Sequence, residues 1–301
     1  MMQYVIGVDA GATKTAATVF SAQDGSPLFT TTAGPGNFSE APDDAARELL
    51  RAVDACRKAV PDGVCVFAAV GAAGMRASGL AEPTARLLES RCGCPAQVMD
   101  DGLMALHAGL RDRDGVLVIA GTGSVAYARR GDRCASSGGW GMTLDDRGSG
   151  TDIALEACRR MTERWDRGLP LTELDGQVLK QLNCETVWQL PAALRGLTKG
   201  EIAALAPLVM EAARRGDAGA EEDLRGAGIR LARMAAAAGS RLGLQEPLTV
   251  LSGSVLKNCV PVREAFCTAW AAMYPGASFT RNDGPVERGA FWLWHQRREQ
   301  Q

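Results

Sequence analysis

Histidine is scarce in this sequence, and that scarcity excludes one class of metal site. The 301 residues include only two histidines, His107 and His295, and neither stands in an H-E-x-x-H or H-x-x-E-H pattern. Zinc sites built on histidine need ligands at such spacings. We therefore expect no histidine-built zinc site, a packing role for His107 and a surface position for His295.

Paired cysteines are also missing. The nine cysteines are odd in number, and no two of them have C-x-x-C spacing. Disulfide frameworks use an even number of cysteines at regular spacings, mostly in small secreted domains. We expect these cysteines to be small apolar residues in a reducing compartment.

Long apolar runs and an excess of positive charge are absent as well. Runs such as Val116–Ala120 are too short to cross a bilayer. The net charge of -2 offers no basic face for nucleic acid. The N-terminal residues MMQYVIGVDAG lack a basic region, a long apolar stretch and a cleavage site. We expect a cytoplasmic protein without nucleic-acid or membrane partners.

Short apolar strands alternate with amphipathic helices, which predicts an α/β fold. Strands are predicted at residues 3–9, 15–21, 26–32, 64–70, 96–99, 115–120 and 248–251. Helices are predicted at residues 41–60, 81–91, 101–111, 262–273 and 285–298, and residues 151–243 are mostly helical by pattern.

The chain is too long for one small core, so we expect two lobes. The segment VLVIAGTGSVAYARR has the layout of VIGVDAGATKTAATVF: a strand, a Gly/Thr turn and an alternating strand. This weak repeat suggests two mixed sheets flanked by helices and built on one plan. We place the N-terminal lobe at residues 1–114, joined by a C-terminal helix in 285–301, and the C-terminal lobe at 115–284.

The first motif that carries chemistry is GVDAGATKT, residues 7–15. A strand delivers Asp9 to a turn in which Gly11 lets the backbone approach an anion, and we assign Ala12 to the same ATP-binding turn. Thr13 offers a hydroxyl and Lys14 a compact positive charge, which suit nucleotide phosphates. Asp9 suits Mg²⁺, held through water. The alternative is a β-hairpin turn with incidental polar residues.

Two further turns repeat this chemistry. Gly121-Thr122-Gly123-Ser124 follows an apolar strand, and Gly253-Ser254 lies between another strand and a helix. Taken alone, each is matched by an ordinary tight turn. Paired with the first motif, the 121–124 turn would clamp a nucleotide between two lobes, and small residues at 253–254 would let adenine lie on the backbone.

With these three turns in order, the chain resembles the actin, hexokinase and heat-shock-chaperone ATPase superfamily. More narrowly, it resembles the N-acetylglucosamine kinase group of the BadF/BadG/BcrA/BcrD-type ATPases. Further matching pieces are VMDD at 98–101, SGGWG at 137–141, the Arg215-Gly216-Asp217 break and residues 285–290 before the last helix. The resemblance implies a two-lobed actin-like fold, ATP, Mg²⁺, an amino-sugar substrate and a homodimer.

The resemblance also implies a catalytic base. Asp101 matches the family's aspartate at the end of a short strand, where a carboxylate would take the proton of the attacking sugar hydroxyl. Asp100 is the rival, and helix capping is the alternative role for Asp101. We favour Asp101 because strand alternation turns Asp100 the other way.

Other matches imply a sugar pocket. Asn37 resembles an asparagine that holds sugar hydroxyls, although it also suits a plain turn. Gly139 and Trp140 resemble the wall for the acetamido group, although a core tryptophan is an alternative. Asp146 resembles a second sugar-binding aspartate, and Thr122 is assigned to the sugar as well as to ATP.

One loop departs from the family. Relatives usually carry Gly-Asp-Glu-Gly-Ser where this chain has Asp145-Asp146-Arg147-Gly148-Ser149. Arg147 replaces an acid, so it favours an anionic amino sugar such as N-acetylmuramate if it points into the pocket. It carries no such meaning if it pairs with Asp145.

The sequence therefore predicts a kinase that phosphorylates N-acetylglucosamine at its 6-hydroxyl. Three alternatives stay open: a kinase for glucosamine or N-acetylmuramate, an ATPase activator of an iron–sulfur dehydratase, and a non-catalytic sugar or nucleotide sensor. The turn at 121–124 lacks the adjacent cysteine that an activator would need, and the set Asp9, Lys14, Asp101 and Asp146 argues against a sensor.

Overall fold

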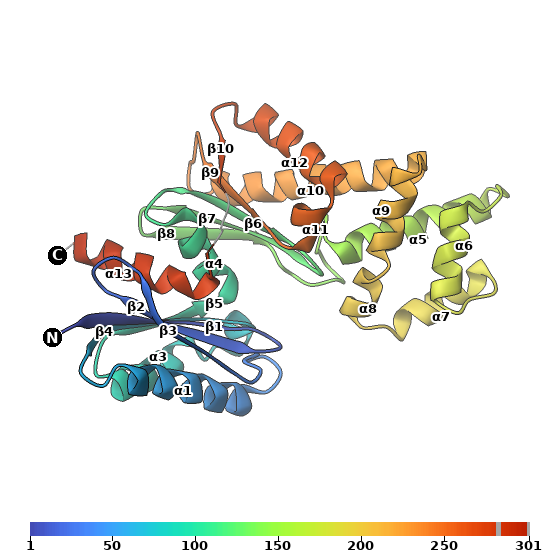
Figure 1. Cartoon of the computed structure of the whole chain (residues 1–301). Helices are drawn as coiled ribbons and strands as arrows, with labels where there is room; N and C mark the ends of the chain where they lie inside the picture. Colours follow the sequence, from blue (N-terminus) through green and yellow to red (C-terminus); the bar gives the residue numbers. More distant parts are fainter. Residues whose placement is uncertain (281–283, 300–301) are drawn as a thin grey trace. The chain divides into compact units, whose positions relative to one another are not determined.

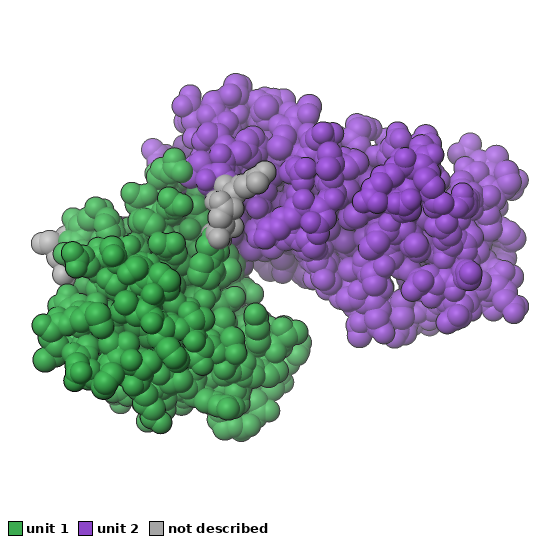
Figure 2. All heavy atoms as spheres, in the orientation of Figure 1, with its two compact units in different colours: residues 1–114, 281–301 green, residues 115–280 purple. Residues whose placement is uncertain are grey.

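The computed structural model describes residues 1–280 and 284–299, which fall into two compact units (Figures 1 and 2). Unit 1 contains residues 1–114 and the described part of 281–301, and unit 2 contains residues 115–280. Residues 281–283, at the end of the C-terminal lobe as expected from sequence, and residues 300–301 lie outside the described part of the chain.

Unit 1 is built on a five-stranded sheet in the order β3-β2-β1-β4-β5. Strand β1 pairs antiparallel with β2 and parallel with β4, which in turn pairs parallel with β5. The strands are β1 (Gln3–Ala10), β2 (Thr15–Ser21), β3 (Pro27–Ala33), β4 (Val64–Ala72) and β5 (Ala96–Asp100). The helical elements are α1 (Pro42–Ala59), α2 (Met75–Ser78), α3 (Ala81–Cys92), α4 (Asp101–Leu110), the 3-10 turn η2 (Val286–Arg288) and α13 (Gly289–Glu299).

Side-chain alternation along the strands gives this sheet two apolar faces, as expected for strands buried on both sides. Ile6 and Val8 of β1 pack with α1 and α3 in one cluster. Val5 packs on the other face with Met104 of α4 and Leu293 of α13. Figure 1 shows these helix pairs on opposite sides of the sheet.

The C-terminal segment approaches β1 at van der Waals distance. An added Cβ at Gly7 would lie 2.0 Å from the backbone oxygen of Glu287. The Glu287 side chain is buried and accepts a hydrogen bond from the Thr18 hydroxyl of β2 at 2.9 Å. Residues from the two ends of the chain thus complete one core.

Unit 2 is built on a five-stranded sheet in the order β10-β9-β6-β7-β8. Its strands are β6 (Gly115–Ala120), β7 (Ser124–Arg130), β8 (Arg133–Gly138), β9 (Leu248–Ser252) and β10 (Ser278–Thr280). Its helical elements are α5 (Gly150–Asp166), α6 (Glu173–Gln181), η1 (Val187–Gln189), α7 (Leu190–Arg195), α8 (Lys199–Ala203), α9 (Ala206–Arg214), α10 (Ala218–Ser240), α11 (Ser254–Asn258) and α12 (Val260–Met273). Helices α10 and α12 pack so closely that a Cβ at Gly228 would lie 2.3 Å from the Val262 oxygen.

The predicted fold class, two mixed sheets each flanked by helices, is confirmed. The predicted helix at 285–298 is wrong in its first turn, because residues 286–288 form a 3-10 turn and α13 begins at Gly289. As expected, His107 is buried in α4. No helix among residues 1–280 and 284–299 is both long and apolar enough to cross a membrane.

Candidate active site

In unit 1, the carboxyl ends of three parallel strands meet at one edge of the sheet. Ala10 of β1 is in register with Ala72 of β4, and Ala72 is in register with Asp100 of β5. Asp9 therefore lies one residue inside this edge, and Asp101 opens α4 directly beyond it. Ligands of open α/β sheets commonly bind at this end of the strands.

Gly71 lets α4 come close to this edge. It is in register with Asp9 on one side and with Met99 on the other. An added Cβ at Gly71 would lie 2.4 Å from the Met104 side chain and 3.2 Å from the Asp101 Cα. A glycine between the strands thus allows the first turn of α4 to sit against the sheet.

The carboxyl groups at this edge influence one another. The pKa of Asp9 is raised to about 6, mainly by burial and also by the charges of Asp101 and Glu287, against the opposing effect of Lys14. The Asp101 residue is exposed to solvent, yet protein packed around its carboxyl group raises its pKa, and the Asp100 charge adds to this effect. Clustered carboxyls with raised pKa values are typical of functional sites.

Asp100 and Asp101 have different surroundings. Asp100 accepts a hydrogen bond from the backbone N–H of Arg76 and pairs with the Arg76 Nε, both at 2.8 Å. It also occupies the N-cap position of α4. Asp101 is instead the first residue of the helix and accepts from the Gly102 N–H at 2.7 Å. The capping position expected for Asp101 therefore belongs to Asp100.

The turn at residues 11–14, which the sequence predicts to bind phosphate and which we call the first phosphate turn, is closed by a hydrogen bond from the Gly11 N–H to the Lys14 oxygen at 2.9 Å. This leaves Ala12, Thr13 and Lys14 exposed. The next loop is tied to the turn, because the N–H of Gly36 donates to the Gly11 oxygen at 2.9 Å.

Asn37 follows in that loop. Its Oδ1 accepts from the backbone N–H of Ser39 at 3.1 Å and from the Ser39 hydroxyl at 2.9 Å. Asn37 therefore shapes a turn, as the alternative interpretation expected, and its side-chain amide still has donors for a ligand. The structure brings the loop of Asn37 to the phosphate turn.

In unit 2, the other two turns lie side by side. Strands β6 and β9 are parallel neighbours, with Ile119 in register with Ser252. Gly253 has φ +89°, and a Cβ there would lie 2.2 Å from the Ala120 oxygen. A Cβ at Gly121 would lie 3.6 Å from the Ser254 hydroxyl. The 121–124 turn and Gly253-Ser254 thus form one surface of small residues.

The loop after β8 depends on positive φ angles. Gly138, Gly139 and Gly141 have φ between +76° and +85°. Trp140 is 74% exposed, so it is not a core tryptophan. It lines an open pocket of about 390 Å³, whose other lining residues are Ser137, Gly138, Leu144, Asp145, Arg147, Arg230, Arg233 and Met234.

Asp146 belongs to the same loop, shortly before the start of α5. It has φ +61° and is only 2% exposed. Its Oδ1 accepts from the Ser124 N–H at 3.1 Å, and its Oδ2 lies 2.7 Å from the Nζ of Lys199. Lys199 lies outside every motif of the sequence.

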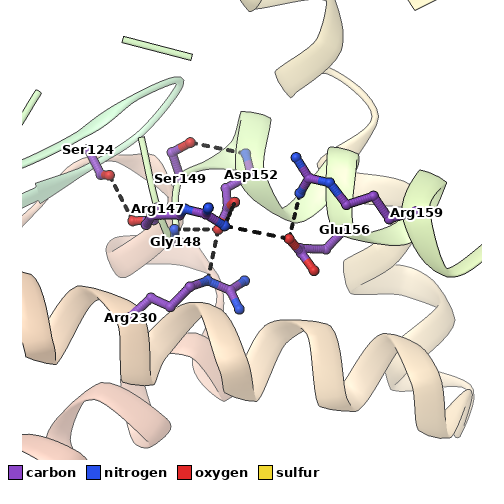
Figure 3. A network of polar contacts seen from close by, with 8 residues as sticks. All are labelled: Ser124, Arg147, Gly148, Ser149, Asp152, Glu156, Arg159 and Arg230. Carbon is purple, nitrogen blue, oxygen red and sulfur yellow. Dashed lines mark hydrogen bonds and ion pairs between the residues drawn. The ribbon is translucent and has the colours of Figure 1, made fainter. Parts of the chain in front are cut away.

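Arg147 takes part in a polar network with the start of α5 (Figure 3). Its guanidinium lies 3.8 Å from Asp152 and 3.9 Å from Glu156, and it makes no ion pair with Asp145 in the described part of the chain. The buried Asp152 accepts from the Gly148 N–H at 2.7 Å and from Arg230 Nε at 2.9 Å. The expected alternative pairing of Arg147 with Asp145 is therefore wrong, and the loop is held by Asp152.

Known proteins resemble this chain along most of its length. The model of the BadF/BadG/BcrA/BcrD ATPase family matches residues 6–274. This chain belongs to that family.

Curated relatives of this BadF/BadG/BcrA/BcrD family member include sugar kinases. An N-acetylmuramic acid/N-acetylglucosamine kinase from Clostridium acetobutylicum is 30% identical over 85% of this chain and 87% of its own length. An N-acetyl-D-glucosamine kinase from Dictyostelium discoideum is 27% identical over 70% and 72%. Among solved structures, a candidate N-acetylglucosamine kinase from Chromobacterium violaceum has a TM-score of 0.71 at 24% identity, over 97% and 99% of the two chains. The resemblance to the N-acetylglucosamine kinase group is confirmed.

The residues of this family member fit ATP and its metal. Exposed turns at residues 12–14 and at Thr122 offer backbone N–H groups and hydroxyls, which suit phosphate oxygens. Among the residues that the structure describes, no three or more acidic, cysteine or histidine side chains form a cage for a metal ion. Mg²⁺ commonly needs only one or two carboxylates besides phosphates and water, and Asp9 can supply one.

Proposed function

We propose that this chain is an ATP-dependent kinase that phosphorylates an amino sugar, N-acetylglucosamine, at its 6-hydroxyl. The observation that carries the proposal is the edge of the sheet in unit 1. There Asp9 and Asp101 lie close enough to raise the pKa of Asp9, and the exposed Lys14 contributes the opposing positive charge. The curated relatives, named as kinases of N-acetylated amino sugars, support this substrate class.

In this proposal, unit 1 supplies the base and contacts to phosphate. Asp101 takes the proton of the sugar 6-hydroxyl while the hydroxyl oxygen attacks the γ-phosphorus, and ADP leaves. Thr13 and Lys14 bind phosphate oxygens, together with the backbone of Gly11 and Ala12. Asp9 would hold Mg²⁺, through water, and the bound ion would supply positive charge to neutralise the phosphates. Asn37 holds sugar hydroxyls through its amide.

Unit 2 supplies the rest of the nucleotide and sugar contacts. The turn Gly121-Thr122-Gly123-Ser124 binds phosphate, and Gly253 and Ser254 lie against adenosine. Thr122, Gly139, Trp140 and Asp146 contact the sugar. Trp140 offers a large exposed apolar face for the acetamido group, and Asp146 accepts a hydrogen bond from a sugar hydroxyl.

N-Acetylmuramate is a second candidate substrate, and one pocket favours it. Arg147, Arg230 and Arg233 line the same open pocket as Trp140. Arg147 and Arg230 already pair with acidic side chains, whereas Arg233 is exposed and has no ion pair among the described residues. A carboxylate on the sugar would find positive charge in this pocket.

The test is kcat/KM, measured by coupled ADP release, for N-acetylglucosamine, glucosamine, glucose and N-acetylmuramate. Loss of one small group from a fitted pocket costs about 1–3 kcal/mol, so we expect N-acetylglucosamine to exceed glucosamine and glucose by roughly 10- to 200-fold. A preference for free glucosamine would contradict the acetamido pocket. No turnover of any of the four sugars would contradict the proposed kinase activity. A sugar or nucleotide sensor would then remain, and a coloured, air-sensitive protein would favour the dehydratase activator instead.

Arg147→Glu separates the two acetylated sugars. Since Arg147 pairs with Asp152 and Glu156 at 3.8–3.9 Å, we expect this variant to keep the preference for N-acetylglucosamine over glucosamine. If Arg147 binds a carboxylate instead, the variant loses N-acetylmuramate turnover selectively. The same kcat/KM panel distinguishes the two outcomes.

We also propose that the enzyme works with Mg²⁺ as a cytoplasmic homodimer. The assay run with and without added Mg²⁺ tests the first point, and sedimentation equilibrium of the purified protein tests the second. Full activity in excess chelator, or a monomer at working concentration, would contradict these points.

A further inference from the structure

Lys199 lies directly against the second phosphate turn. An added Cβ at Gly123 would lie 2.3 Å from the Lys199 Nζ and 2.6 Å from the Asp146 Oδ1. The ammonium group of Lys199 thus occupies the space beside Gly123. The turn assigned to phosphate therefore has a cation beside it that no sequence motif indicates.

Backbone contacts hold Lys199 at this place. The Thr151 hydroxyl lies 2.7 Å from the Thr122 oxygen and 3.3 Å from the Lys199 oxygen. The Gly150 N–H donates to the Gly121 oxygen at 2.8 Å. The first residues of α5 thus connect the turn to the start of α8, and Lys199 approaches the turn because of this connection.

The two members of the Lys199–Asp146 pair differ in burial. The Lys199 side chain is 37% exposed, whereas that of Asp146 is 3% exposed. The lysine can therefore move its ammonium group toward an incoming anion, while the carboxylate stays in place. A phosphoryl oxygen beside Gly123 would offer Lys199 a second anionic partner within the reach of its flexible stem.

We propose that Lys199 binds a phosphoryl oxygen of ATP and exchanges its contact with Asp146 for that contact when the nucleotide binds. The exchange leaves an Asp146 oxygen available to accept a sugar hydroxyl, so nucleotide binding promotes sugar binding. This inference rests on the proposed ATP-dependent kinase, and it adds a phosphate ligand and a coupling between the two substrates.

The variant Lys199→Met tests the phosphate contact, since methionine keeps the apolar stem without the charge. Its matched control is Lys180→Met, which removes an exposed lysine of α6 in the same unit. Titration calorimetry measures binding of AMPPNP and of adenosine. We expect Lys199→Met to weaken AMPPNP binding by about ten- to hundredfold, as for a charge-assisted hydrogen bond, and to leave adenosine binding within about twofold.

Coupling gives a readout that a merely structural lysine would not change. In the wild type and in Lys180→Met, saturating AMPPNP should tighten N-acetylglucosamine binding by at least about threefold. In Lys199→Met the ratio of N-acetylglucosamine affinities with and without AMPPNP should fall to about one. The reason is that this variant already lacks the ion pair that AMPPNP binding would break. Lys199→Met leaves the buried Asp146 carboxylate without its ion-pair partner, and the double variant Lys199→Met/Asp146→Asn removes that charge. Thermal unfolding of all variants tests whether they fold. If only the double variant folds, its AMPPNP affinity is the deciding measurement.

Two results would overturn the inference: an AMPPNP affinity within about twofold of the wild type, or equal losses for AMPPNP and adenosine. Either would leave the kinase proposal standing. The converse failure is recognisable too, since wild-type protein that binds AMPPNP but phosphorylates no sugar would contradict the kinase while the Lys199 measurement still holds.

Discussion

Replacing Asp101 with asparagine tests the central chemical assignment. In the wild type, Asp101 accepts a hydrogen bond from the Gly102 N–H at 2.7 Å. The asparagine amide oxygen can accept the same bond, but the amide cannot take a proton from the sugar. General base catalysis contributes about a hundred- to ten-thousandfold, so kcat should fall by that factor, equivalent to about 3–5 kcal/mol in the barrier. Affinities for AMPPNP and for N-acetylglucosamine should change by less than about threefold.

Asp100→Asn is the matched control, because it changes the neighbouring carboxyl by the same single atom. The Arg76 side chain that pairs with Asp100 is 56% exposed and that of Asp100 is 12% exposed, so chemical denaturation of this variant should accompany its kinetics. We expect kcat at high pH to stay within about threefold of the wild type.

The pH profile separates the two carboxyls further. In the proposed mechanism Asp101 acts in its deprotonated form, so its raised pKa should move the acid limb of the activity profile upward from the ordinary range of a carboxyl group. The Asp100 charge is one cause of that increase, so Asp100→Asn should move the acid limb to lower pH. Near-wild-type kcat in Asp101→Asn together with an inactive Asp100→Asn would refute the assignment.

The other predictions concern the phosphate turn of unit 1 and two glycines, one in each unit. Lys14→Ala and Asp9→Ala should both raise the KM for ATP, but added Mg²⁺ should partly rescue only Asp9→Ala; equal rescue in a Mg²⁺ titration would contradict separate roles. Gly7→Ala places a methyl group 2.0 Å from the Glu287 oxygen and should destabilise the protein by about 3 kcal/mol or more. Gly176→Ala, which has open space in α6, should stabilise by about 0.5–1 kcal/mol. Chemical denaturation of both glycine variants measures this difference.

Local pattern was enough to predict most of the fold. The apolar runs and turn residues placed β1, β2, β4 and β6 within a few residues of their observed bounds. Strand β8 was missed because its residues RCASSG show no apolar alternation, and β10 was missed because it has only three residues. Both strands are defined by pairing with their neighbours, which sequence pattern does not report.

The sequence offers candidate site residues where one segment carries them, and it gives no signal for contacts made between distant segments. Strand alternation favoured Asp101 over Asp100 as the base. The ion pair of Asp100 with Arg76, which lies in a different segment, could not be read from the sequence. Arg147 finds its partners on α5 rather than at its neighbour Asp145. Lys199 reaches the second phosphate turn only because Thr151 connects α8 to it, and no spacing along the chain records that contact.

The division of unit 1 between two ends of the chain affects how the protein forms during synthesis. Gly7 of β1 contacts Glu287, and Leu293 of α13 covers the sheet face that includes Val5. Unit 2 is continuous in sequence, so all of its residues leave the ribosome before α13 does. Until then β1, β4 and α4 expose an apolar surface that only the last helix can cover. A nascent chain that stalls after unit 2 would therefore carry one finished unit and one unit with an uncovered apolar face.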